Sequence, residues 1–114
     1  MNIDSFLEKL NKTPQEITFS ETIAVIENNY NFSPTAFENG LLHNAAGENS
    51  GSCKIFAFAE LQKLSKEATL SCFGAYYREE VLGDLEGTNH QNIRDFMKSS
   101  WDGIAFYGEA LTSK

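Results

Sequence analysis

The sequence predicts a mainly α-helical fold: a compact bundle of about five helices with a polar, Gly- and Asn-rich loop and a small β-hairpin or two-stranded sheet. Apolar residues recur with a helical period in five segments, whereas residues 30–52 lose that period and are rich in turn-forming residues. The chain has 114 residues, of which 41% are hydrophobic and 12% aromatic. This is enough apolar material for one core without disulfides or metals, so we expect a single domain, residues 1–114.

The N-terminal part is expected to form two helices joined by a capped turn. The first helix covers residues 3–11, where four apolar residues are spaced i, i+3, i+4 and i+7. These are Ile3, Phe6, Leu7 and Leu10. The segment Thr13-Pro-Gln-Glu16 predicts a capping box that starts a helical turn. Ser20 is expected to cap the second helix, which ends near Asn28-Asn29. Its apolar face comprises Phe19, Ile23, Ile26 and Tyr30.

The middle of the chain is expected to hold a hairpin or ordered loop and then the central helix. Asn39-Gly40 is the dipeptide that a type I′ hairpin turn needs. Residues 54–64 are nearly all apolar at first and amphipathic later, as expected of a helix that enters the core. Ser65 can cap the next helix. The inward face of that helix would comprise Thr69, Cys72, Phe73 and Tyr76.

The C-terminal third is expected to contain a connector, one more helix and a short strand. Residues 79–87 show no sustained period and include two Gly, which favours a connector or turn. Thr88 and Gln91 have the spacing of a second capping box. The helix that follows would place Ile93, Phe96, Met97 and Trp101 on one face. Residues 103–108 predict a short strand able to pair with the region of Phe37.

The charge balance and the hydropathy pattern exclude several classes of function. Sixteen acidic and nine basic residues give a net charge of −7, which repels the phosphates of nucleic acids. No run of eighteen apolar residues is present, and the N-terminus lacks the features of a Sec signal peptide. We therefore expect a soluble protein with no nucleic-acid partner and no membrane segment. The two cysteines are expected to be reduced thiols of a cytosolic protein.

The polar run from Asn39 to Lys54 is the leading candidate for a binding site. Gly-rich backbone lined with donors and acceptors can present polar groups to a partner. Together with the last predicted helix, this run supplies the candidate ligand- or partner-binding residues. These are His43, Asn44, Glu48, Asn49, Ser52, Lys54, Asn92 and Arg94. The alternative is that the Asn and Ser side chains satisfy the backbone groups of their own loop.

Cys53 is the candidate nucleophile, because it lies at the start of the predicted central helix and beside Lys54. Both neighbours would lower the pKa of the thiol, and His43 or His90 could serve as the base. The tentative catalytic residues are therefore Cys53, His43 and His90. The alternative is a small buried thiol that fills space beneath the loop. No metal site and no cofactor are expected, since the Cys and His residues lack the close pairs of a zinc site.

Six strings between residues 33 and 98 carry a family resemblance that covers almost the whole chain. They are Ser33–Gly40, His43–Ala59, Cys72–Gly74, Tyr76–Arg78, Glu86–Arg94 and Phe96–Lys98. These strings closely resemble the HopJ type III effector family. The resemblance implies a small bacterial protein that a type III secretion system injects into plant cells, and so a part in virulence. It implies no catalytic residues. The site of action is thus either the bacterial cytoplasm or a host cell.

Two functions follow as expectations. The first is a small acidic interaction protein without enzymatic activity, which presents its polar loop to a protein partner, such as a host protein, or to a small polar ligand. The second is a small thiol-dependent hydrolase or transferase that uses Cys53 with His43 or His90. The position of the Cys53 sulfur relative to the two imidazoles distinguishes the two functions. The sequence leaves the oligomeric state open.

Overall fold

A computed structural model describes residues 2–114 of the protein. Within this range there are five α-helices and five short strands. The helices are α1 (Ile3–Lys12), α2 (Phe19–Asn29), α3 (Ser50–Leu61), α4 (Lys66–Ser71) and α5 (Gln91–Ser99). The strands are β1 (Tyr30–Phe32), β2 (Phe37–Asn39), β3 (Leu42–Asn44), β4 (Ile104–Phe106) and β5 (Leu111–Ser113). A π-helix covers Tyr76–Val81, and 3₁₀ turns cover Pro14–Glu16 and Ser100–Gly103.

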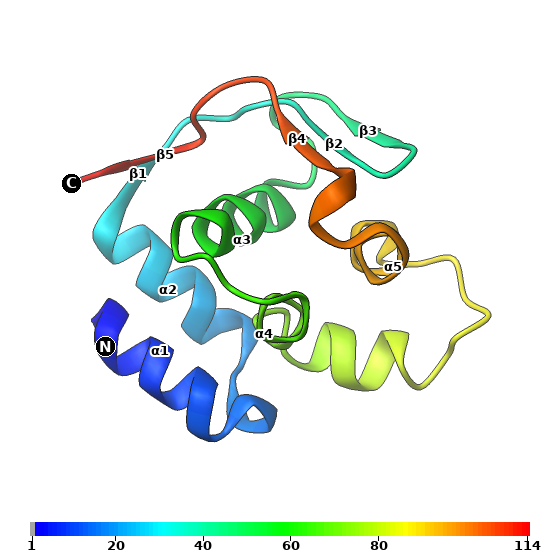
Figure 1. Ribbon diagram of the computed structural model, residues 1–114, viewed down its shortest axis with the longest axis horizontal. Coiled ribbons are helices and arrows are strands. Elements are labelled where there is room, and N and C mark those ends of the chain that lie inside the picture. Colours follow the sequence, from blue (N-terminus) through cyan, green and yellow to red (C-terminus); the bar gives the residue numbers. More distant parts are fainter. Residues whose placement is uncertain (1) are drawn as a thin grey trace.

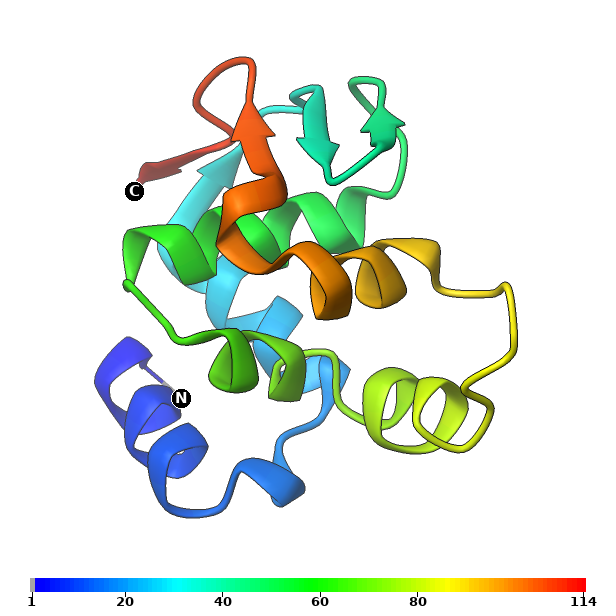
Figure 2. The same cartoon turned by 45° about the vertical axis from the view of Figure 1, so that its right-hand side comes forward.

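The strands lie along one side of α3, and α1, α2 and α4 lie on the other (Figure 1). Helix α5 packs beside α3 and carries the chain back to the strand side, as the turned view in Figure 2 shows. The mainly helical class is as predicted. The β component is larger than predicted, because the strands form two small antiparallel sheets, β1-β5 and β3-β2-β4.

The three-stranded sheet contains the predicted hairpin and the predicted C-terminal strand. Strands β2 and β3 pair through Asn39 and Leu42, and β4 pairs with the other edge of β2. The turn itself differs from the prediction. Its two central residues are Gly40 and Leu41, and only Gly40 has a positive φ, of 63°. This is the pattern of a type II′ turn, in which Gly occupies the first central position.

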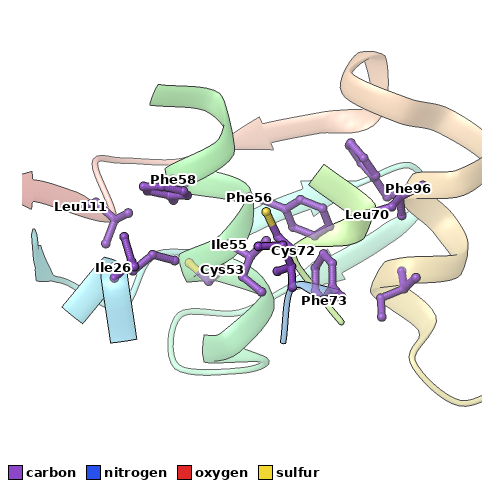
Figure 3. Close-up of a cluster of buried hydrophobic side chains, with 14 of the residues drawn as sticks. Ile26, Cys53, Ile55, Phe56, Phe58, Leu70, Cys72, Phe73, Phe96 and Leu111 are labelled. Carbon is purple, nitrogen blue, oxygen red and sulfur yellow. The ribbon is translucent and has the colours of Figure 1, made fainter. Parts of the chain in front are cut away.

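The core is built around α3, which is buried on several sides. Figure 3 shows Phe56 extending from α3 towards Phe73 and Phe96, while Phe58 extends towards the opposite end of the core. The ring centroid of Phe56 lies 5.4 Å from that of Phe73 and 4.9 Å from that of Phe96. The ring centroids of Phe58 and Phe6 of α1 lie 5.9 Å apart. Truncating a buried Phe of this kind to Ala costs about 3–5 kcal/mol, so these rings fix how the helices pack.

The helix starts in the N-terminal part differ from the prediction. The Thr13 hydroxyl donates to the carbonyl of Lys9, 3.2 Å away, so it belongs to the end of α1 and does not cap the next turn. The capping box is formed instead by Thr18 and Glu21, and the predicted cap Ser20 lies within α2. Helix α1 covers the predicted residues and extends one further, to Lys12.

The segment after α4 also differs from the prediction. Cys72 is buried as expected, but the helix ends at Ser71, and Gly74 reverses the chain with a φ of 62°. A side chain at Gly74 would meet the backbone nitrogen of Phe19 at 2.7 Å. The chain turns here because only Gly allows this close approach. Tyr76 therefore leaves the predicted buried face and starts the π-helix, which takes up the first residues of the predicted connector.

The predicted capping box of Thr88 and Gln91 does not form. Helix α5 starts at Gln91, and its N-cap is His90, which has a left-handed backbone and no side-chain cap. Arg94 explains the late start, because its guanidinium donates to the carbonyl and to the side-chain oxygen of Asn89, at 2.6 and 2.7 Å. These bonds hold residues 88–90 in a bend instead of a helical turn.

Candidate functional site

The polar run from Asn39 to Lys54 does not form one site. Its side chains go to three places: the outer face of the three-stranded sheet, a pocket between α3 and α5, and the core. This division follows from the alternation of side chains along β2 and β3 and from the start of α3 at Ser50.

Beneath the pocket lies a network of four asparagines, Asn39, Asn44, Asn49 and Asn92. Asn44 and Asn92 exchange side-chain hydrogen bonds of 3.0 and 3.1 Å, and Asn39 donates to the Asn92 carbonyl at 2.8 Å. Asn49 donates to the side-chain oxygen of Asn44 at 2.7 Å. All except Asn49 are buried. Because each buried amide needs partners, the network ties the hairpin and the starts of α3 and α5 to one another.

The pocket itself has a volume of about 460 Å³ and is bordered by the starts of α3 and α5. Its polar lining comes from Asn49, Ser52, Tyr76, His90, Gln91 and Asn92. The N-cap residues Asn49 and His90 both have left-handed backbones, with φ of 50° and 51°, and neither caps its helix through its side chain. The backbone N–H groups in the first turns of α3 and α5 therefore donate no hydrogen bond to an N-cap side chain. The pocket is rich in uncharged donors and acceptors.

Aromatic rings and one imidazole complete the wall. Tyr76 lies 5.0 Å from Phe19 in an edge-to-face arrangement and 5.0 Å from the imidazole of His90, measured between centroids. His90 Nε2 lies 2.8 Å from Glu80 Oε1. Since a carboxylate can only accept, this nitrogen carries the proton, and in the neutral ring Nδ1 remains an acceptor. No hydrogen bond within residues 2–114 joins His90 to the hydroxyl of Ser52, so the pocket shows no activated serine.

Cys53 lies in the core and does not line this pocket. Its Sγ is 3.5 Å from the carbonyl oxygen of Thr35. Burial raises the pKa of the thiol and outweighs the lowering by Lys54, which is opposite to the predicted direction. No hydrogen bond in the described chain connects Cys53 to His43 or His90. Cys72 is also buried, and desolvation raises its pKa to about 12.

His43 lies on the outer face of the three-stranded sheet, away from the asparagine network. Its side chain is 57% exposed, and its Nδ1–H donates to the carboxylate of Glu38, the residue opposite it on β2. The hydroxyl of Tyr107 donates to the same oxygen at 2.9 Å. His43 is therefore part of a surface cluster with Glu38 and Tyr107, which sequence reasoning did not find.

The three charged residues among the predicted binding residues have structural partners. Lys54 pairs with Glu27 at 3.0 Å. Glu48 accepts from the backbone N–H of Ala45 at 2.9 Å and so closes its own loop. Arg94 is buried against the bend before α5. Of the predicted residues, the structure thus brings together Asn49, Ser52, Asn92 and His90 at the pocket, with Asn44 beneath them.

Sequence reasoning missed the pocket residues Tyr76, Gln91 and Phe19 as members of a site. In the sequence, Gln91 has the spacing of a capping box, and the two aromatic residues fall on apolar helix faces. A second groove, of about 290 Å³ between α1 and α4, is lined mainly by aliphatic side chains and by none of the predicted site residues.

Two absences hold for the part of the chain that the structure describes. No group of three or more His, Cys, Asp or Glu residues in residues 2–114 is placed to hold a metal ion. None of the helices in this range has the length and apolar character needed to cross a membrane.

The fold and the pocket define a small, mainly helical protein whose strand layer covers a Phe-rich core. The chain belongs to the HopJ family: the family profile described as HopJ type III effector protein matches residues 3–111. The chain is similar to VPA0580, a protein of unknown function whose crystal structure is known: the two sequences are 55% identical, and the two structures superpose with a TM-score of 0.99. That similarity covers 100% of this chain and 95% of the other. A comparison with functionally curated proteins found no match to this sequence.

The strings that carry the family resemblance meet at the pocket. Apart from Phe19 and Leu42, every lining residue belongs to one of them: Asn49, Gly51 and Ser52 to one string, Phe73 and Tyr76 to two others, and residues 90–93 to a fourth. Segments far apart in the sequence therefore come together around one cavity.

Proposed function

We propose that this protein is a small binding protein without enzymatic activity, and that the pocket between α3 and α5 holds a polar group of its partner. The observation that carries the proposal is the pocket's lining, which combines uncharged amides and a hydroxyl with aromatic walls. Such a mixture recognises amide or hydroxyl groups attached to an apolar body. The buried asparagine network beneath it supports the rigidity that selective binding needs.

The positions of the predicted catalytic residues give no support to the thiol-dependent alternative. A nucleophilic cysteine needs a depressed pKa and a base within reach. The Cys53 thiol has a raised pKa, and its neighbour is a backbone carbonyl. His43 and His90 each pair with a different glutamate. Binding is therefore the function that these residues support best.

The binding proposal is tested by screening short peptide amides and other small polar amides against the protein by ligand-observed NMR. We expect weak binding by some of these probes and its loss in Ser52→Leu, which fills the pocket with an apolar side chain. Ser5→Leu is the matched control, because Ser5 is exposed on α1. Binding that survives Ser52→Leu, or the absence of binding by every probe, would contradict the proposal.

We also propose, from the family, that the protein acts after delivery by a type III secretion system, with a host protein as its partner. Support comes from the family name alone. Fusion of the N-terminal segment to a reporter enzyme tests it in a bacterium with and without a working secretion system. Reporter activity inside recipient cells only with the working system is the expected result. Equal absence of activity from both strains would place the function in the bacterial cytoplasm.

A further inference from the structure

The outer face of the β3-β2-β4 sheet carries a side-chain cluster that the pocket does not use. Phe37 and Asn39 of β2 point into the protein and are buried, whereas Glu38 between them points outward. Glu38 lies opposite His43 of β3. Tyr107, which directly follows β4, reaches the same carboxylate. We call Glu38, His43 and Tyr107 the sheet-face cluster.

The carboxylate of Glu38 organises this cluster. Its Oε2 accepts hydrogen bonds from both His43 Nδ1 and the Tyr107 hydroxyl, and the two aromatic rings meet edge to face with centroids 6.2 Å apart. These two donors lower the pKa of Glu38, so it is ionised at neutral pH. No hydrogen bond within residues 2–114 reaches Oε1. One oxygen of an oriented, ionised carboxylate therefore remains available to an outside donor, beside Tyr107, a residue that is 68% exposed.

The strands that form this face carry no Lys or Arg. Residues 13–53 and 99–113, which contain all five strands, include no Lys or Arg. On the strand side of the chain, residues 30–49 and 99–113, the acidic residues are Glu38, Glu48, Asp102 and Glu109. The basic residues that directly flank residues 13–53 and 99–113 are Lys12, Lys54, Lys98 and Lys114, of which Lys12 is paired with Glu8 and Lys54 with Glu27. None of the Lys and Arg ion pairs within residues 2–114 involves Glu38, so its carboxylate is open to a guanidinium from a partner.

We propose that the sheet-face cluster docks an arginine-bearing segment of a partner protein. An arginine guanidinium donates in a planar fork to a carboxylate and also packs on an aromatic face, which matches Glu38 beside Tyr107. Leu41, fully exposed at the tip of the same hairpin, offers an apolar contact to a neighbouring residue of that segment. This surface is separate from the pocket, so the proposal stands or falls independently of the proposed pocket ligand.

The test measures binding of a fluorescent peptide with two arginines flanked by leucines, by fluorescence anisotropy at low salt. The same peptide with citrulline, which keeps the shape and removes the charge, is the control ligand. We expect the arginine peptide to bind more tightly than the citrulline peptide. Glu38→Gln should weaken it about tenfold, the size expected for one charge-assisted hydrogen bond, and Tyr107→Ala should weaken it by a smaller factor.

Glu16→Gln is the matched protein variant, since it removes one negative charge from the exposed turn at the opposite end of the molecule from the strands (Figure 1). It should leave the affinity unchanged. Equal weakening by Glu16→Gln and Glu38→Gln would show that only overall charge matters and would overturn the proposal. Equal binding of the arginine and citrulline peptides would overturn it as well. Circular dichroism of each variant confirms that the fold is intact.

Discussion

The pocket and the sheet-face cluster both draw on residues 39–54, yet they are built in opposite ways. Asn44 and Asn92 beneath the pocket are buried and bonded to each other, so water is excluded from the polar groups that position it. Glu38 and Tyr107 form their bond on the exposed surface, where solvent screens it. The pocket is therefore coupled to folding, whereas the sheet face is free to change without loss of the fold. The two regions can be tested separately for this reason.

The largest expected effect comes from breaking the asparagine network. Asn92→Ala removes the side-chain acceptor of Asn39 and Asn44 and one of the two donors to the Asn44 side-chain oxygen. It should lower the free energy of unfolding by about 3 kcal/mol, because buried polar groups then lack partners. Chemical denaturation measures this loss. Asn31→Ala, at an exposed position of β1, is the control and should change stability little. Similar losses of stability in both variants would contradict the claim that the buried asparagine network stabilises the fold more than an exposed asparagine does.

The next effect concerns Cys53, which is buried in the core. Because burial raises the pKa of its thiol, less thiolate is present at neutral pH than in a free cysteine. Alkylation of both cysteines in the folded protein should be at least about tenfold slower than in the unfolded chain. Mass spectrometry of the labelled peptides follows each site. Rapid labelling of Cys53 alone would favour the thiol-dependent function instead.

The smallest expected effect is a titration on the sheet face. The hydrogen bond to ionised Glu38 raises the pKa of Tyr107. In Glu38→Gln the phenol of Tyr107 should therefore ionise at a lower pH than in the unchanged protein. Ultraviolet pH titrations of both proteins detect this shift, and the Tyr107→Phe variant identifies the part of the signal that comes from Tyr107. The bond stabilises the fold only while the phenol is neutral and the carboxylate is charged. Its contribution is lost as the pH rises through the raised pKa of Tyr107, and also as it falls through the lowered pKa of Glu38.

The sequence predicts the helices with strong apolar periods and the β2-β3 hairpin, because these depend on local spacing. The β1-β5 sheet pairs residues 30–32 with residues 111–113 and has no such local signal. The sequence also does not decide which of several capping residues is used. Thr13, Thr18 and Ser20 are all suitable caps within one short segment. The cap that forms, Thr18, lies where Gly74 from a distant part of the chain packs closely against the backbone. Tertiary packing overrides local propensity at that point.

The candidate site was predictable only in part for the same reason. Asn49 and Ser52 stand out in the sequence because they lie in a polar, Gly-rich run. Tyr76 and Gln91 carry no such signal, since they become site residues only when α5 and the π-helix pack beside the start of α3. The bond between Glu38 and Tyr107 joins residues 69 positions apart in sequence, and no local pattern predicts it.

The central claim is that these two regions are separate binding surfaces. Amide chemical-shift mapping by two-dimensional NMR during titration with the arginine peptide tests it most directly. We expect shifts at residues 37–44 and 104–108, with residues 49–52 and 90–92 unchanged. Shifts centred on residues 49–52 and 90–92, or spread evenly over all the acidic surface, would contradict the account.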